Sequence, residues 1–183
     1  MRTSLTDPLE IAVVSAPGVA GLVGLTLCPG KKDAVAVWAR DLDADVAAIR
    51  GWGAEVVVSL IEDDEFLILD VVQLPQTVTR YGMRWVHLPI RDVSVPGERF
   101  ETRWQTAGVE LRRVLRRGGR VLVHCRGGLG RAGTIAARLL VELGMEPQEA
   151  ITAVRSARSL QAIETRAQEA HVRACRPVSD DAA

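Results

Sequence analysis

Residues 120–143 read RVLVHCRGGLGRAGTIAARLLVEL, and this stretch decides the fold. Val121–His124 is an apolar, β-branched run, which predicts a buried strand. The glycine-rich segment Cys125–Gly130 predicts a tight loop, and a helix is expected from about Arg131. Four apolar residues share one face of that helix. They are Ile135, Leu139, Leu140 and Leu143.

The loop has the composition of a phosphate-binding loop. The amide groups at a helix N-terminus attract a dianion, and the loop glycines are expected to allow close backbone approach and positive φ. Arg131 can bind two phosphoryl oxygens with its planar guanidinium. The same positive field favours the thiolate of Cys125, which we predict to be a phosphoryl-transfer nucleophile. The residues expected to hold the phosphate are Arg126, Gly127, Gly128, Leu129, Gly130 and Arg131.

Three other interpretations of this loop are open. The pattern Gly128-x-Gly130-x-x-Gly133 also fits a dinucleotide-binding fingerprint, but no following strand ends in an acidic residue. A nucleotide P-loop needs Gly-Lys-Ser/Thr, and the loop has no lysine. A buried structural cysteine is the third interpretation. The combination of Cys125, Arg131 and three glycines at this spacing disfavours it.

The pattern His-Cys-x-x-Gly-x-x-Arg at residues 124–131 resembles the signature of the cysteine-dependent protein phosphatases, which include tyrosine and dual-specificity enzymes. HCRGGLGR is especially similar to the loop of the kinase-associated phosphatase group. The resemblance covers roughly Gly21 to Arg173. It implies a mobile upstream loop with an acidic residue and catalysis that needs no cofactor and no metal. One position departs from the family pattern: Ala132 stands where the family usually has Ser or Thr.

The loop that follows one of the expected strands is predicted to supply the general acid. Residues 89–96 read PIRDVSVP and form a loop that leaves the carboxyl end of a strand, where open α/β sheets bind ligands. Asp92 is therefore the predicted general acid, and the Pro-x-x-Asp arrangement also resembles the acid loop of the family. The acidic run at residues 62–65 is expected to be a solvated helix start. The alternative is an acidic rim that repels highly anionic substrates.

Three further residues are expected to support catalysis. His124 is predicted to orient or polarise Cys125 from beneath. Thr134 could replace the hydroxyl that Ala132 lacks, although its helical position points it elsewhere. Residues 162–168, Ala-Ile-x-Thr-x-x-Gln, resemble a segment of the kinase-associated phosphatases, and this resemblance implies that Gln168 orients the hydrolytic water.

Length and composition indicate a single domain. The chain has 183 residues, of which 48% are hydrophobic, and its net charge is zero. This balance indicates no nucleic-acid partner. We expect an N-terminal segment at 1–20 with a short strand and turn, a phosphatase domain at 21–175, and a flexible tail at 176–183. The near-absence of lysine beside abundant arginine suggests a GC-rich bacterial genome.

The N-terminal residues and the cysteines indicate a cytoplasmic protein. Pro17-Gly18 interrupts the apolar residues 9–28, which are read as two short strands rather than a signal peptide or a membrane span. The three cysteines are too far apart for a disulfide framework or a zinc motif, and a reactive thiolate suits a reducing compartment. No membrane partner is expected, and no oligomeric state is predicted. The cysteines are Cys28, Cys125 and Cys175.

Alternating strands and helices predict an α/β fold, with a mainly parallel sheet of four or five strands and helices on both faces, as in protein tyrosine phosphatases. The expected strands are Ile11–Val14, Leu22–Leu27, Ala54–Leu60, Arg84–Leu88 and Val121–His124. Besides the helix from Arg131, the expected helices are Asp41–Arg50, Val72–Gly82, Gly97–Arg117, one from Pro147 and one ending near Cys175.

These features together predict hydrolysis of phosphomonoesters through a phosphocysteine. The expected substrate is a phosphorylated protein or peptide, with phosphotyrosine favoured and phosphoserine or phosphothreonine also open. Of the five residues between Cys125 and Arg131 only Arg126 is charged, which disfavours the alternative of an inositol phosphate or phosphoinositide phosphatase. A catalytically weak phosphopeptide-binding protein is another alternative, if Ala132 marks lost turnover. Sulfur transfer and arsenate reduction are remote alternatives.

Overall fold

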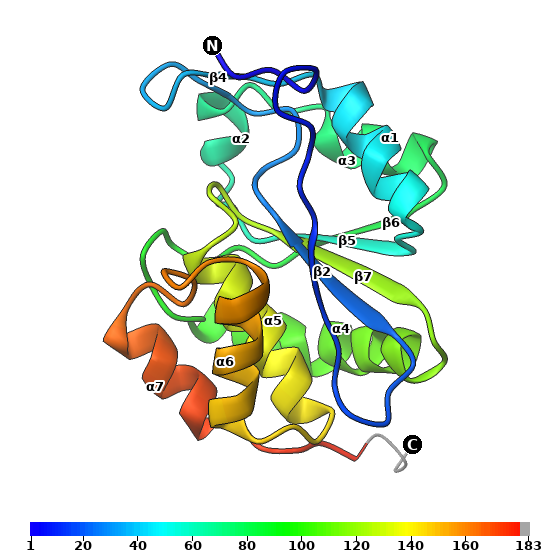
Figure 1. The fold of residues 1–183 in the computed structure, drawn as a ribbon, viewed down its shortest axis with the longest axis vertical. Coiled ribbons are helices and arrows are strands. Elements are labelled where there is room, and N and C mark those ends of the chain that lie inside the picture. The colour runs from blue at the N-terminus through cyan, green and yellow to red at the C-terminus, as the bar shows by residue number, and fades with distance from the viewer. Residues whose placement is uncertain (180–183) are drawn as a thin grey trace.

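Five strands form the central sheet in the computed structural model, which describes residues 1–179 (Figure 1). Their order is β1-β2-β7-β5-β6. All neighbours are parallel except β1 and β2, which are antiparallel. The predicted α/β fold with a mainly parallel sheet is confirmed. The strands are β1 (Ala12–Val14), β2 (Leu22–Thr26), β5 (Val56–Ser59), β6 (Arg84–His87) and β7 (Arg120–His124).

Helices cover both faces of this sheet. In Figure 1, α1, α2 and α3 lie on one side of the sheet, and α4, α5, α6 and α7 lie on the other. The first group is α1 (Leu42–Trp52), α2 (Glu65–Ile68) and α3 (Leu74–Arg80). The second group is α4 (Glu98–Arg116), α5 (Gly130–Glu142), α6 (Pro147–Ala157) and α7 (Arg166–Ala174).

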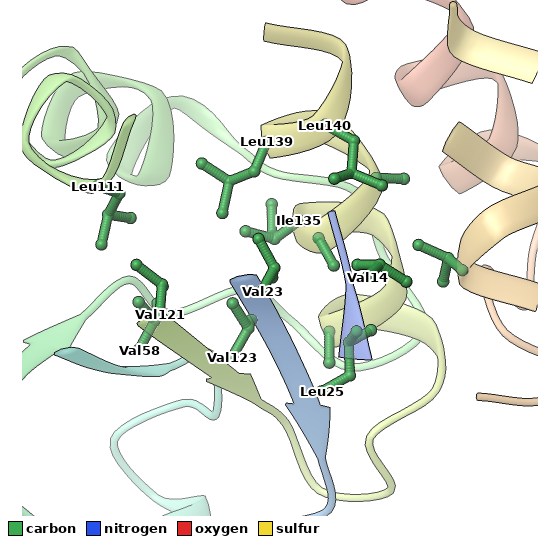
Figure 2. Packing of buried hydrophobic residues seen from close by; sticks show 14 of the residues in the cluster. Val14, Val23, Leu25, Val58, Leu111, Val121, Val123, Ile135, Leu139 and Leu140 are labelled. Atoms are coloured by element: carbon green, nitrogen blue, oxygen red, sulfur yellow. The ribbon is translucent and has the colours of Figure 1, made fainter. Parts of the chain in front are cut away.

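Apolar side chains of β7 point alternately to the two faces of the sheet, which explains why helices pack on both faces. Val121 and Val123 belong to the core under α4 and α5, whereas Leu122 belongs to the core on the α1 and α3 side. Figure 2 shows Leu111 of α4 and Leu139 of α5 above these strands. Each such apolar side chain contributes about 1.5–3 kcal/mol when it is fully buried. The central position of β7 therefore fixes the place of the loop that follows it.

One small hairpin lies outside the sequence prediction. Its strands, β3 (Lys32–Asp33) and β4 (Trp38–Ala39), precede α1 and are too short to display a hydrophobic period. The helix start expected at residues 62–65 is the four-residue helix α2, which begins at Glu65. The predicted longer helices all form, with ends shifted by a few residues. Asp41 caps α1 by accepting the Ala44 N–H.

The expected tail is partly held to the body of the domain. The Val178 N–H donates to the Glu142 carbonyl at 2.9 Å, and the Arg116 guanidinium donates to the Val178 carbonyl at 2.7 Å. The flexible tail expected over 176–183 stays a prediction, although these two bonds place Val178 beside α4 and α5. Residues 180–183 lie outside the described residues. Within residues 1–179, no helix is both long enough and apolar enough to span a membrane.

Candidate active site

The predicted phosphate loop connects β7 to α5, and Cys125 is its first residue. Cys125 is 3% exposed and lines a cavity of about 320 Å³ together with Arg126, Gly127, Leu129 and Gly130. The Gly128 N–H donates to the Cys125 Sγ at 3.2 Å. The sulfur therefore already receives a hydrogen bond from the loop, which stabilises negative charge on it.

Of the three loop glycines, only Gly128 has the expected positive φ, +72°. A Cβ at this position would lie 2.5 Å from the Thr26 carbonyl oxygen, so the loop can approach β2 only with glycine here. The expectation of positive φ is wrong for Gly127 and Gly130. A Cβ at Gly127 would meet open space, whereas a Cβ at Gly130 would lie 2.0 Å from Glu164 Oε2.

Two cations hold the loop carbonyls away from the cysteine. Lys31 Nζ donates to the Arg126 carbonyl at 3.1 Å. Arg158 donates from Nη2 to the Gly127 carbonyl at 3.3 Å and from Nε to the Gly128 carbonyl at 3.1 Å. In a trans peptide the next N–H points opposite to the carbonyl. These contacts therefore fix the loop backbone with the Gly128 N–H directed at Sγ, as a cradle for an anion requires.

Arg131 is buried at the start of α5, and all but one of its nitrogen donors have partners among the described residues. Its Nη1 and Nη2 donate to both carboxylate oxygens of Glu65 at 2.5 and 2.9 Å, and Nη1 also donates to the Ile90 carbonyl at 3.1 Å. Its Nε is buried and has no hydrogen-bond partner among residues 1–179. A buried donor without a partner costs about 1–3 kcal/mol, and a bound phosphate oxygen would satisfy it.

Glu65 is a site residue that the sequence reasoning missed. It was grouped with a solvated acidic run, yet it is 7% exposed and forms a bidentate pair with Arg131. Burial alone would raise its pKa, but the hydrogen bonds from Arg131 and the Glu62 N–H, together with the charges of Arg131 and Arg126, lower the pKa overall. Its position shortly after β5 is the signal that could have found it, because parallel strands β5 and β7 end at the same edge of the sheet.

Asp92 lies on the predicted loop after β6 and lines the same cavity as Cys125. Its side chain is 53% exposed and forms an ion pair with Arg131, with 2.9 Å between Oδ1 and Nη2. Val93, the next residue, has φ of +57°, a strained conformation for a β-branched residue. The structure thus brings Cys125, Arg131 and Asp92 together.

The acidic residues before Glu65 do not reach this cavity. Glu62, Asp63 and Asp64 line a different hollow of about 520 Å³ beside the Asp92 loop. Asp63 there pairs with Arg99 at 3.3 Å. These residues are therefore not part of the group around Cys125, and the idea that they rim it is wrong.

His124 lies at the end of β7 and is fully buried. Its Nε2 is 2.6 Å from Ser59 Oγ, which also accepts the Trp85 Nε1–H at 2.8 Å. Burial lowers the pKa of His124 to about 4, so the ring is neutral at neutral pH. A neutral ring held in this way can support the strand end beneath Cys125 but adds no positive charge to the cradle.

The other two supporting residues have their polar groups engaged. The Thr134 hydroxyl donates to the Gly130 carbonyl at 2.7 Å, so it is turned away from the sulfur as expected. Gln168 is fully buried, accepts the Thr165 N–H with Oε1 at 3.2 Å and donates from Nε2 to the Ser94 carbonyl at 3.1 Å. Gln168 therefore ties α7 to the Asp92 loop, and orienting a water would require it to give up one of these bonds.

No group of three or more His, Cys, Asp or Glu side chains in the described part of the chain could hold a metal ion. The arrangement instead offers a sulfur nucleophile, backbone and guanidinium donors for phosphoryl oxygens, and a carboxyl group at the mouth of the cavity. These are the parts that transfer of a phosphoryl group to sulfur needs.

Comparison with known proteins identifies a phosphatase family. A family model described as "Swiss Army Knife protein, DSP-PTPase phosphatase domain" matches residues 34–181. Cyclin-dependent kinase inhibitor 3 of Rattus norvegicus is 31% identical over 128 residues, which are 69% of this chain. The match spans about 59% of the length of that relative.

Two solved structures share the fold over nearly the whole chain. One is kinase associated phosphatase with its catalytic-site cysteine substituted by serine: TM-score 0.79, 26% identity, 90% of this chain and 92% of that chain covered. The other is Tk-PTP in the active form: TM-score 0.64, 25% identity, 85% of this chain and 94% of that chain covered. The fold predicted from the sequence is therefore the fold of known phosphatases.

Proposed function

The chain belongs to the dual-specificity protein phosphatase (DSP-PTPase) family, and from this premise we propose that it hydrolyses protein phosphomonoesters through a phosphocysteine on Cys125. One observation carries the proposal: the buried Nε of Arg131, which has no hydrogen-bond partner among residues 1–179, lies in the first turn of the helix that follows the Cys125 loop. A phosphate bound by the Cys125 loop would supply an oxygen acceptor for this donor. The first test is turnover of a simple aryl phosphate, with vanadate as a competitive inhibitor.

In the first step the Cys125 thiolate attacks phosphorus and the ester oxygen leaves. Loop amides and the Arg131 guanidinium bind the phosphoryl oxygens, and these contacts act on the charge of the transition state. Asp92 donates its proton to the leaving oxygen. Because Asp92 pairs with Arg131 in the structure, we expect the incoming phosphate to take over the Arg131 contact and to release Asp92 toward the leaving group.

In the second step water attacks the phosphocysteine. The Asp92 carboxylate now accepts a proton from that water, and the Cys125 thiolate leaves as inorganic phosphate forms. The Gly128 N–H that donates to Sγ at 3.2 Å stabilises the leaving thiolate. The enzyme returns to its starting state, with Cys125 as the thiolate and the proton on Asp92.

Asp92→Asn is expected to slow alkyl phosphate esters about 100-fold, because these esters need a proton on the leaving oxygen. An aryl ester with a good leaving group should be slowed far less. The measurement is kcat/KM for both ester classes.

Equal losses for the two classes of ester would contradict the assignment of Asp92. Asp63→Asn is a suitable control, because Asp63 lies in the neighbouring hollow and pairs with Arg99. That variant should keep the wild-type difference between alkyl and aryl esters.

Ala132 leads us to expect that breakdown of the phosphocysteine limits turnover. A hydroxyl at this position could donate to the sulfur, and a charge-assisted hydrogen bond contributes about 1.5–3 kcal/mol. Ala132 is fully buried, and the nearby Thr134 hydroxyl is used by the Gly130 carbonyl. The wild-type enzyme should therefore release a burst of the leaving group before a slow steady state.

Ala132→Ser should raise the steady-state rate about ten-fold and leave the burst rate nearly unchanged. Stopped-flow measurement with an activated aryl ester separates the two rates. A wild type without a burst and a serine variant that is no faster would show that the Gly128 N–H alone suffices.

A second candidate function, phosphopeptide binding without turnover, rests on the same Ala132. It would be supported by tight binding of a phosphotyrosine peptide with neither a burst nor steady-state release of phosphate.

A further inference from the structure

The charges around the Cys125 cavity do not suit a substrate with several phosphates. Arg126 Nη2 is 2.7 Å from Asp33 Oδ2, and Lys31 Nζ donates to the Arg126 carbonyl and lies over the Trp38 ring. Both cations that line the cavity are thus already engaged. Three carboxylates stand beside them. The charged residues that line the cavity are Lys31, Asp33, Asp92, Arg126 and Glu164.

Glu164 is the carboxylate of this group whose charge is uncompensated. It lies in the turn between α6 and α7, and Oε2 lies so close to α5 that a Cβ on Gly130 would be 2.0 Å away. Asp33 pairs with Arg126 and Asp92 pairs with Arg131, but no hydrogen bond or ion pair holds the Glu164 carboxylate within residues 1–179. A negative charge therefore lies at the edge of the anion cradle.

The rest of the rim is apolar. Val35 of the β3–β4 hairpin is 92% exposed, and Val93 of the Asp92 loop is 61% exposed. Ala36 and Leu129 line the cavity with them. Apolar side chains exposed on two sides of a cavity indicate that an apolar body enters between them.

We infer that this site takes a single phosphate on an aromatic side chain with a cationic group beside it, and that Glu164 binds the cation. The substrate class is thus a phosphotyrosyl segment with a neighbouring arginine or lysine. This inference rests on the proposed function and specifies its substrate. A phosphate dianion brought to the α5 N-terminus lies close to the Glu164 carboxylate, and a cation supplied by the substrate offsets the repulsion between them. A second phosphate in that place would instead add to the repulsion.

The test uses phosphotyrosine peptides that are identical except for the residues flanking the phosphotyrosine. One carries arginine, one alanine and one aspartate, with substitutions placed on one side at a time, and kcat/KM is measured at low and high salt. Phenyl phosphate serves as the reference without a peptide charge. For the wild type we expect arginine on the favoured side to raise kcat/KM about five-fold over alanine, and aspartate to lower it. High salt should reduce both effects.

Glu164→Arg should reverse the order, so that the aspartate peptide becomes the better substrate. The matched control is Glu149→Arg, which makes the same charge change at an exposed position in the first turn of α6. It should keep the wild-type order. Because Glu164 is exposed, its replacement is not expected to disturb folding.

An equal kcat/KM for the three peptides in the wild type would overturn the inference, as would a Glu164→Arg variant that keeps the wild-type order. In either case continued hydrolysis of phenyl phosphate would leave the proposed phosphatase activity intact. Loss of phenyl phosphate and peptide hydrolysis together in the wild type would instead overturn the proposed function.

Discussion

Cys125→Ser is expected to reduce turnover by roughly 10⁴-fold or more and to leave anion binding in place. A serine hydroxyl is a far weaker nucleophile than a thiolate, and its oxygen is a poor leaving group in the second step. The anion cradle should survive, because Lys31 and Arg158 hold the loop carbonyls independently of the sulfur. Turnover of an aryl phosphate and equilibrium binding of phosphate measure the two properties separately.

The matched control for this variant is Cys175→Ser, which replaces a cysteine near the end of α7, outside the cavity. It should keep wild-type turnover. A Cys125→Ser enzyme with substantial activity would show that Cys125 is not the nucleophile. Loss of both turnover and phosphate binding would show that the sulfur is needed to hold the loop.

Arg131→Lys is expected to reduce kcat/KM on the order of 1,000-fold, although the positive charge is kept. Loss of one donor to a developing oxyanion already costs about 10²–10³ in rate, and a lysine replaces the planar guanidinium with a single ammonium. That ammonium cannot bind both Glu65 oxygens and a phosphoryl oxygen at once. The measurement is kcat/KM for an aryl phosphate, together with the affinity for vanadate.

Glu65→Gln tests whether Glu65 positions this arginine. The amide keeps the size of the side chain but presents one acceptor oxygen in place of two, so the Arg131 guanidinium should be held less firmly. We expect a smaller loss of activity than in Arg131→Lys and a lower affinity for vanadate. An unchanged affinity would show that the loop alone orients Arg131.

The Glu65–Arg131 pair also gives a pH dependence of stability. Burial raises the folded-state pKa of Glu65, but hydrogen bonds from Arg131 and the Glu62 N–H and the charges of nearby arginines together lower it. Its contribution to stability is therefore present at neutral pH and is lost as the pH falls through the folded-state pKa. The Glu65→Gln variant should lack this part of the acid destabilisation.

Most of the sheet and the position of the nucleophile could be predicted from local pattern. Val121–Val123 read as a buried strand because β7 is covered on both faces, and the Cys125 loop could be located from glycine and arginine spacing alone. The two-residue strands β3 and β4 could not be predicted, because such short elements have no period.

The site residues that the sequence reasoning missed are brought to the site by contacts between distant segments of the chain. Glu65 meets Arg131 across 66 positions of the sequence, and its charged neighbours gave no sign that one member of the run is buried. Glu164 was part of a segment noted only for Gln168, yet it is Glu164 that lines the cavity while Gln168 is fully buried. Only the packing of α7 and the preceding turn against α5 determines that Glu164 lines the cavity and that Gln168 is buried.

The central claim is a covalent phosphocysteine, and direct capture of that intermediate tests it. Wild-type enzyme turning over an activated aryl phosphate is quenched in acid within the burst, digested and examined by mass spectrometry. We predict one added phosphoryl group on the peptide that contains Cys125, formed at the rate of the burst and absent from Cys125→Ser. Full turnover with an unmodified Cys125 peptide, or a phosphoryl group on another residue, would contradict the account.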